Sequence, residues 1–297
     1  MGLYRLAAFP KNKTGGNLAG VYLDADNLSD EDMLKIAKEV NYSETAFVLK
    51  SSIADFRLRF FTPLYEVDLC GHATIATFNL LKQLDVVRKG IYIQETKAGV
   101  LKIDIQKDKV FMEQNPPVFG VEINKNEIFE LFDHNDFLND SLPIRIVSTG
   151  LKEIFIPIKS KKIMNDLVPN FVRISELSKK YDCIGVHIFS LDQEVDAYCR
   201  NFAPLVGINE ESATGTSSGA LACYLNRYLD CEKVNYIFRQ GYAMAMPSEI
   251  EVLLTIRDEM IEKVYVGGSA NQISEWGGLN EISNNNSWKR SFNWENY

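Results

Sequence analysis

The sequence contains few of the residues that disulfide-linked, metal-bound or membrane-spanning proteins need. It has five cysteines and three histidines among 297 residues, and no two cysteines are spaced as a CxxC pair. The odd number of cysteines and the lack of an apolar leader after Met1 favour a reducing, cytoplasmic location. No segment approaches the ~18 consecutive apolar residues of a membrane helix, so we expect no membrane association.

Positive charge is also scarce. The 32 Lys and Arg residues are outnumbered by 40 Asp and Glu residues, which gives a formal net charge of −8. Because phosphate backbones attract basic proteins, nucleic acid is not an expected partner. Residues 15–20 (GGNLAG) match neither a dinucleotide-binding fingerprint nor a phosphate-binding loop, and we expect no cofactor.

The remaining composition is that of an ordinary globular protein, with 46% hydrophobic and 24% charged residues. At about 150 residues per domain, this length predicts two domains. Two adjacent prolines at 116 and 117 and the polar segment 123–142, interpreted as a connection, place the boundary near residues 115–125. We assign residues 1–118 and 119–275 to the two halves, and residues 276–297 to a tail without periodicity.

Local patterns predict several elements within these halves. Ser29, an acidic first turn and apolar residues three and four apart predict a helix over 30–40. Alternating apolar residues predict strands in four segments: 45–50, 56–61, 100–110 and 144–147. We also expect a homodimer, for which the tail is a candidate contact.

An internal repeat indicates the architecture. The sequence FTPL at 61–64 recurs as FAPL at 202–205, and Ala-Thr at 73–74 recurs at 213–214. Each copy leads from a strand containing arginine, through an acidic turn, into a helix rich in small uncharged residues. Such helices are typically buried, with strands packed closely around them. The sequence therefore predicts an α+β fold of two pseudo-symmetric halves, each a mixed β-sheet wrapped around a central helix.

Seven short motifs follow one another in a fixed order. They are SETAFV at 43–48, EVDLCGHAT at 66–74, ETKAG at 95–99, VSTGL at 147–151, ATGT at 213–216, QGY at 240–242 and VGGSA at 266–270. Together they resemble the PhzF family of phenazine-biosynthesis isomerases. The resemblance implies a diaminopimelate epimerase-like fold, which agrees with the repeat.

Glu44 is the first candidate for chemistry. A carboxylate that precedes an apolar strand can lie at the mouth of a cleft and act as a general base. From composition alone, a solvated loop glutamate is the simpler interpretation. In the PhzF family the glutamate of this Ser-Glu-Thr motif removes a substrate proton and returns it, so the resemblance implies that role for Glu44.

His72 lies at the expected start of a helix, where the helix dipole favours a neutral imidazole. The residues alone leave open a substrate contact, a capping or core histidine, or a metal ligand beside Asp68 and Cys70. The resemblance implies a substrate contact and no metal. His134 and His187 match no motif and are interpreted as structural or surface residues.

Cys70 corresponds to the first catalytic thiol of the diaminopimelate epimerases. A two-base epimerase needs a second thiol, but the equivalent place in the second half holds Thr214 or Thr216. We therefore interpret Cys70 as a packed residue.

Glu211 precedes the ATGT motif, at a place where the family usually has aspartate. The longer side chain and Thr216 in place of serine both fall where substrate would be held. The predicted catalytic residues are thus Glu44, His72 and Glu211. The starts of the two helices bring backbone N–H groups that bind anions, and the predicted substrate-binding residues are Gly71, Ala73, Thr214, Gly215 and Thr216. Close helix packing is the alternative role for the glycines.

The function implied by the resemblance is that of a cofactor-independent isomerase. It would shuttle a proton through one glutamate on a small amino or hydroxy acid, and a small carboxylic acid is therefore the expected partner. The family's archetype acts on dihydro-hydroxyanthranilate, but PhzF-like proteins are far more widespread than phenazine synthesis, so we do not assign that substrate. A two-base amino-acid epimerase and a non-catalytic relative that binds a small acid or a protein remain as alternatives.

Overall fold

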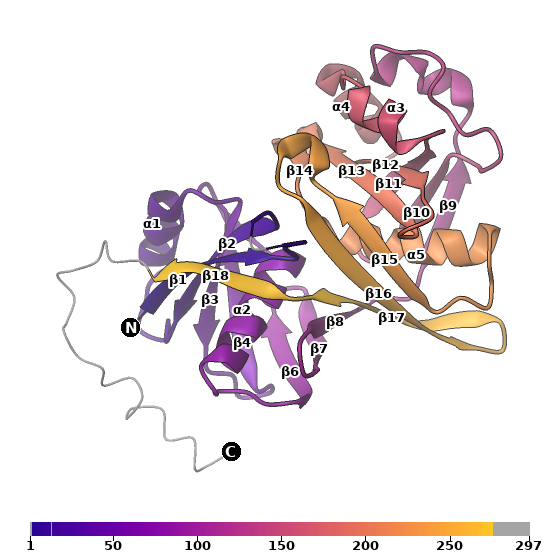
Figure 1. The fold of residues 1–297 in the computed structure, drawn as a ribbon. Helices are drawn as coiled ribbons and strands as arrows, with labels where there is room; N and C mark the ends of the chain where they lie inside the picture. The colour runs from indigo at the N-terminus through magenta and orange to yellow at the C-terminus, as the bar shows by residue number, and fades with distance from the viewer. Residues whose placement is uncertain (1, 13, 276–297) are drawn as a thin grey trace.

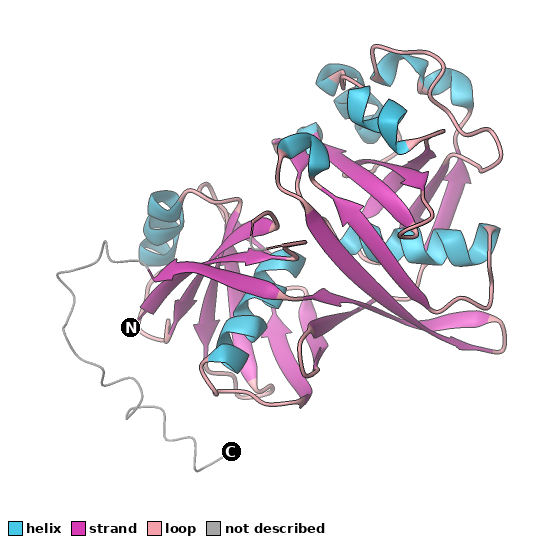
Figure 2. Cartoon of the chain, viewed as in Figure 1, coloured by secondary structure: helices cyan, strands magenta, loops and turns pink. Residues whose placement is uncertain are grey.

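Two helix-centred halves lie side by side in the computed structural model, which describes residues 2–12 and 14–275 (Figure 1). The central helices are α2 (Gly71–Gln83) in the first half and α5 (Gly215–Tyr228) in the second. Curled strands surround each of them, as Figure 2 shows. The predicted α+β architecture is confirmed. The predicted tail at 276–297 lies outside the described residues.

In the first half, the helix α1 (Asp30–Val40) connects two parallel strands, β2 and β3. Its start matches the prediction, because Ser29 and Asp32 form a capping box. The strands of this half are β1 (Gly2–Ala8), β2 (Asn17–Leu23), β3 (Glu44–Leu49), β4 (Phe56–Phe61), β5 (Glu66–Val67), β6 (Gly90–Thr96), β7 (Gly99–Ile105) and β8 (Val110–Gln114).

The second half repeats this order. Helices α3 (Lys161–Asp166) and α4 (Phe171–Lys180) connect the parallel strands β11 and β12, as α1 connects β2 and β3. The strands are β10 (Arg145–Ser148), β11 (Lys152–Pro157), β12 (Gly185–Leu191), β13 (Ala197–Ala203), β14 (Ile208–Glu211), β15 (Asn235–Gln240), β16 (Ser248–Arg257) and β17 (Met260–Gly268). The 3-10 helices are η1 (Lys125–Glu127), η2 (Phe129–Leu131), η3 (Pro204–Val206) and η4 (Tyr242–Met244).

The halves exchange one strand each. Strands β8 and β17 pair antiparallel with each other at the junction of the halves. The strand that follows β8, β9 (Val118–Glu122), pairs with β10 of the second half, whereas β18 (Ala270–Glu275) follows β17 and pairs with β1 of the first half. In Figure 1 the yellow β18 therefore lies among indigo strands. Residues 270–275, which the sequence places in the second half, complete the sheet of the first half.

Two other sequence expectations differ from the structure. The predicted strand 100–110 is two strands, β7 and β8, joined by a turn in which the Gln106 N–H donates to the Lys109 carbonyl at 2.9 Å. The sequence marks this turn, although the strand prediction overlooked it: residues 106–109 (QKDK) are all polar, and the apolar positions change from 101, 103 and 105 before it to 110 and 112 after it. The segment 123–142 is more than a connection, because it contains η1 and η2 and buries Leu131, Phe132 and Phe137 in a hydrophobic cluster of the second half.

One hydrophobic core runs through both halves. It surrounds α2 and α5 and includes residues as far apart as Phe60 and Tyr224. Two smaller clusters lie on the outer faces, one beneath α1 and the other beneath α3 and α4. Because the central core is shared, each half contributes to the stability of the other.

The same ion pair occurs in each half. Arg59 on β4 donates through Nε and Nη2 to the two carboxylate oxygens of Glu66, at 2.8 and 3.0 Å. Arg200 on β13 makes the same two bonds to Glu210, at 2.8 and 3.0 Å. A bidentate pair of this kind fixes orientation. Each one ties the acidic turn before a central helix to the neighbouring strand.

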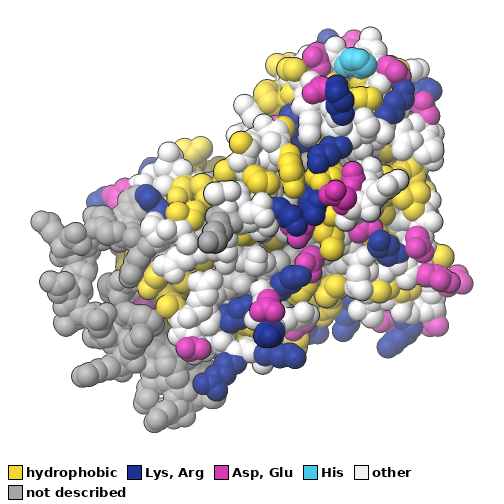
Figure 3. All heavy atoms as spheres, viewed as in Figure 1, with side chains coloured by type: hydrophobic (Ala, Val, Ile, Leu, Met, Phe, Trp, Pro, Cys, Tyr) yellow, Lys and Arg dark blue, Asp and Glu magenta, His cyan; other side chains and the backbone are white. Residues whose placement is uncertain are grey.

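None of the helices in the described ranges is long and apolar enough to cross a lipid bilayer. On the face drawn in Figure 3, Lys and Arg side chains are interspersed with Asp and Glu side chains.

We expect Gly267→Ala to destabilise the protein by about 2 kcal/mol, because its β-carbon would overlap the carbonyl oxygen of Val110 in the β8–β17 pair. Gly150→Ala is the matched control, since no atom of the described residues, apart from its chain neighbours, lies within 4 Å of the β-carbon position at Gly150. Urea denaturation of both variants measures the difference. Equal stability of the two would contradict a tight junction.

Candidate active site

The three predicted catalytic residues meet where the two halves join. Glu44 is the first residue of β3, His72 the second residue of α2, and Glu211 the last residue of β14. Nε2 of His72 lies 3.3 Å from Oε2 of Glu44, and Nδ1 lies 3.7 Å from Oε1 of Glu211. The imidazole is therefore flanked by one carboxyl group from each half.

Strand geometry directs Glu211 to this place. Successive side chains of a strand point to opposite faces, and Glu210 is held on the outer face by Arg200. Glu211 then points to the inner face, toward the start of α5. The ion pair of Glu210 thus helps to orient its neighbour.

A set of polar side chains holds the Glu211 carboxyl group. Asn17 donates from Nδ2 to Oε1 at 2.8 Å, and the hydroxyl of Thr214 lies 2.5 Å from Oε2. Gln240 donates to the backbone carbonyl of Glu211 at 2.7 Å and to the Thr214 hydroxyl at 3.0 Å. Burial raises the pKa of Glu211 to about 8, against the opposing effect of Thr214 and with a further increase from the charge of Glu44. At neutral pH this carboxyl group is therefore largely protonated.

His72 is a neutral imidazole for a similar reason. It is buried, and burial lowers its pKa more than the Glu44 carboxylate raises it. The hydroxyl of Ser43 lies 3.3 Å from its Nε2. A neutral imidazole can donate at one ring nitrogen and accept at the other, so His72 can serve either carboxyl group.

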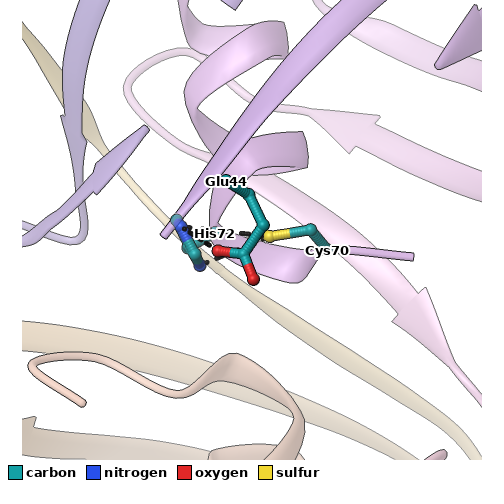
Figure 4. A group of neighbouring side chains, drawn as sticks. All are labelled: Glu44, Cys70 and His72. Atoms are coloured by element: carbon teal, nitrogen blue, oxygen red, sulfur yellow. Dashed lines mark hydrogen bonds and ion pairs between the residues drawn. The ribbon is translucent and has the colours of Figure 1, made fainter. Parts of the chain in front are cut away.

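Glu44, Cys70 and His72 are close enough to be considered as metal ligands (Figure 4). However, Sγ of Cys70 lies 3.4 Å from Nδ1 and 3.9 Å from Nε2 of His72. A sulfur that shared a metal with one ring nitrogen would lie much farther from the other nitrogen. Burial also raises the pKa of the Cys70 thiol well above its usual value. The sulfur position is that of a packing contact. Asp68 lies outside this group and pairs with Lys97 at 3.6 Å.

The predicted substrate-binding residues lie at the two helix starts. Gly71 and Gly215 are the first residues of α2 and α5, and neither cap residue, Cys70 or Thr214, accepts a capping hydrogen bond from a backbone N–H through its side chain. The Ala73 side chain is buried in the core.

Thr216 is the second residue of α5. Its carbonyl accepts a hydrogen bond from Thr149 at 3.2 Å. Its side chain is only partly buried, unlike the neighbouring Gly215 and Ser217.

The two halves place equivalent backbone positions around the site, but the side chains at those positions differ. Phe61 and Phe202 are equivalent, 141 residues apart, and the same offset pairs Glu44 with Gly185. The first residues of α2 and α5 are equivalent, so His72 corresponds to Thr216. The first half alone therefore supplies Glu44 and the imidazole. The Ala-Thr repeat predicted a different register, and that part of the prediction is wrong: Ala73 and Thr74 lie inside α2, whereas Ala213 and Thr214 precede α5.

The sequence did not identify the residues that hold the Glu211 carboxyl group. Asn17 and Gln240 belong to conspicuous short motifs, but nothing local assigns them to Glu211, which lies 194 and 29 residues away. His187, interpreted as structural or surface, is fully buried. The signal that could have placed it is the alternation in β12, which turns His187 toward α5.

We expect Glu211→Gln to change how stability depends on pH. The folded protein holds the Glu211 proton up to about pH 8, whereas the unfolded chain loses it near 4.5. The stability from this group is thus fully present below about pH 4.5 and is lost as the pH rises through about 8. Gln cannot ionise, so the variant should gain stability relative to the native protein across this range. Urea denaturation at several pH values tests this, and parallel curves for the two proteins would contradict it.

Comparison with known proteins gives the family. The PhzC-PhzF family, described as phenazine biosynthesis-like proteins, matches residues 6–275. An uncharacterized isomerase of Clostridium acetobutylicum is 37% identical over 286 residues, which cover 90% of this chain and 94% of the relative.

Solved structures agree with this match. A PhzF-family phenazine biosynthesis protein of Bacillus anthracis superposes with a TM-score of 0.86 at 31% identity, covering 92% of this chain and 97% of that one. A hydroxyproline epimerase of Agrobacterium vitis, at 12% identity, 92% and 89% coverage and a TM-score of 0.59, shares the fold. From the family match, the isomerase relatives and the shared fold, we conclude that this chain belongs to the PhzF-like isomerase family.

Proposed function

We propose that this protein is a cofactor-independent isomerase in which Glu44 alone moves a proton on a small amino or hydroxy acid. In its carboxylate form, Glu44 removes a proton from one carbon of the substrate. The resulting carboxylic acid of Glu44 then returns the proton to another carbon. The electron pair of the broken C–H bond shifts a double bond, and the enzyme is restored. Proton transfer of this kind needs only correctly placed side chains.

The surroundings of Glu44 support its role as the base. Its side chain is 13% exposed, and within the described part of the chain Oε2 makes no hydrogen bond of good geometry, although it lies 3.3 Å from His72. A carboxylate oxygen that is shielded from water and not saturated with donors is available for a substrate proton.

Glu211 and His72 are suited to orienting the substrate. A protonated Glu211 can donate a hydrogen bond to a substrate carbonyl or accept one from an amino group. The neutral His72 lies between it and Glu44. The start of each central helix carries no acidic residue in its first turn, which suits a substrate carboxylate on the backbone N–H groups.

The asymmetry of the site is the observation that carries this proposal. A two-base epimerase needs a base on each side of the substrate, and Gly185 and Thr216 occupy the places equivalent to Glu44 and His72. The place equivalent to Cys70 in the second half, just before α5, holds Thr214 rather than a second thiol. One carboxylate base therefore fits the site better than two bases.

Glu44→Gln should abolish proton exchange without unfolding the protein, because the amide keeps the shape but cannot accept a proton. The loss should be at least about 10²-fold, the smaller end of what general base catalysis supplies. A panel of amino and enamine acids incubated in deuterated water, with C–H exchange followed by NMR, measures it. Full exchange by the variant would move the base to another residue.

Cys70→Ala should retain most of the exchange activity. It should lose about 1 kcal/mol of stability, because removal of a buried thiol leaves only a small cavity. The same exchange assay and a urea denaturation curve test both statements. An inactive but stably folded variant would restore the thiol mechanism.

A further inference from the structure

The second half contains a buried polar row at positions where the first half is apolar. On the inner face of the second sheet, Glu211 is directly opposite Asn201, and Asn201 is directly opposite His187. The equivalent row of the first half is Val67, Phe60 and Ala46. Glu153, the ladder partner of Gly185, takes the place of Ala19, the ladder partner of Glu44.

Asn201 is the centre of this polar row. Its Nδ2 lies 2.9 Å from each carboxylate oxygen of Glu153, 3.1 Å from Nδ1 of His187 and 3.2 Å from the hydroxyl of Ser217 on α5. Glu153 is 4% exposed, and His187 is fully buried. The row therefore extends from the active-site carboxyl group of Glu211 into the interior beneath α5.

Such a row costs stability relative to apolar packing, because buried polar groups must give up their water. The first half shows that this frame also packs with alanine, valine and phenylalanine at these positions. The fold therefore does not require the polar residues. Their position next to Glu211 points to a role in the chemistry of the site.

We propose that Glu153, Asn201 and His187 form a buried positioning network that acts together with the burial of Glu211 to keep its carboxyl group protonated in the resting enzyme. Asn201 donates to both oxygens of Glu153, which stabilises Glu153 as a carboxylate, and this negative charge opposes ionisation of Glu211. The inference rests on the proposed function, in which Glu211 faces the substrate as an acid.

Apart from Glu153, few titratable side chains face Glu211. Those contributed by the first half are Glu44, His72 and Cys70. Arg200 and Glu210 pair with each other on the opposite face of the sheet.

The groups facing Glu153 are His187, Ser217 and the thiol of Cys183. Burial lowers the pKa of His187 to about 3, so its ring is neutral and does not cancel the charge of Glu153. Burial raises the pKa of Glu153, while its hydrogen bonds with Asn201 and Ser217 oppose this rise.

Glu153→Gln tests the proposal directly, since it removes the charge and keeps the shape. We expect the titration midpoint of Glu211 to fall by about one pH unit, the smaller end of the effect of a nearby charge. The midpoint is followed by NMR of protein carrying ¹³C-labelled glutamate, and Glu211→Gln identifies the signal. An unchanged midpoint in Glu153→Gln would overturn the proposal.

Ser217→Ala gives a second, milder test should the first variant not fold. Loss of the Ser217 hydroxyl destabilises the ionised form of Glu153. The titration midpoint of Glu211 should therefore fall again, by less than in Glu153→Gln. Ser178→Ala is its matched control, because Ser178 is also a buried helical serine and its hydroxyl donates to the Ile174 carbonyl of its own helix, at 2.7 Å. The control should leave the midpoint unchanged, and equal midpoints in the two serine variants would contradict the network.

These titrations use the resting protein without substrate, so they are independent of the exchange assay. If Glu44→Gln retained exchange, the proposed base would be wrong and the titration result would still stand. If Glu153→Gln left the midpoint in place, the network would be wrong and the base assignment would be unaffected.

Discussion

The active site depends on the antiparallel pairing of β8 with β17. Met112 and Val266 are directly opposite each other in this pair. Met112 lies against Gly71 at the start of α2, and Val266 lies against Gly215 at the start of α5. One ladder thus supports both helix starts, and the distance between Glu44 or His72 and Glu211 follows from its register. A shift of register would move the carboxyl groups of the two halves apart.

The pseudo-symmetric frame is repeated closely, while the side chains of the site are not. The Arg59–Glu66 and Arg200–Glu210 pairs share the same atoms and distances. Next to them, Val67 of the first half corresponds to Glu211 of the second. The duplicated backbone therefore supplies a rigid frame. Differences between the halves at single positions of that frame place the base, Glu44, in one half and the acid, Glu211, in the other.

Local signals were sufficient for elements whose cause is local. Ser29 and Asp32 are three residues apart, and the helix that they cap was predicted from Ser29, the acidic first turn and the apolar residues that follow within the same segment. The repeat gave the two central helices, and the motif resemblance singled out Glu44, His72 and Glu211. The strand exchange left no such signal, because nothing in residues 270–275 reveals a partner near the start of the chain.

The interior of the site was hidden for the same reason. Asn17 reaches Glu211 across 194 residues, and Asn201 reaches Glu153 across 48. A single polar residue interrupts the apolar pattern of a buried strand, but this interruption does not show which distant side chain the residue contacts. The turn between β7 and β8 was different, because it does leave a local signal: residues 106–109 are four consecutive polar residues, and the apolar positions change from odd to even numbers across them.

The exchange of β9 and β18 has a consequence for the order in which the chain can fold. During synthesis β1 emerges first, yet the strand that covers its outer edge is the last one described, β18. Until residue 275 has left the ribosome, that edge exposes unpaired backbone N–H and C=O groups, the kind of surface on which strands of other chains add. The sheet of the first half can therefore be completed only after nearly the whole protein has been synthesised. Late pairing of β1 with β18, and hence slow completion of this sheet, is a property of this architecture.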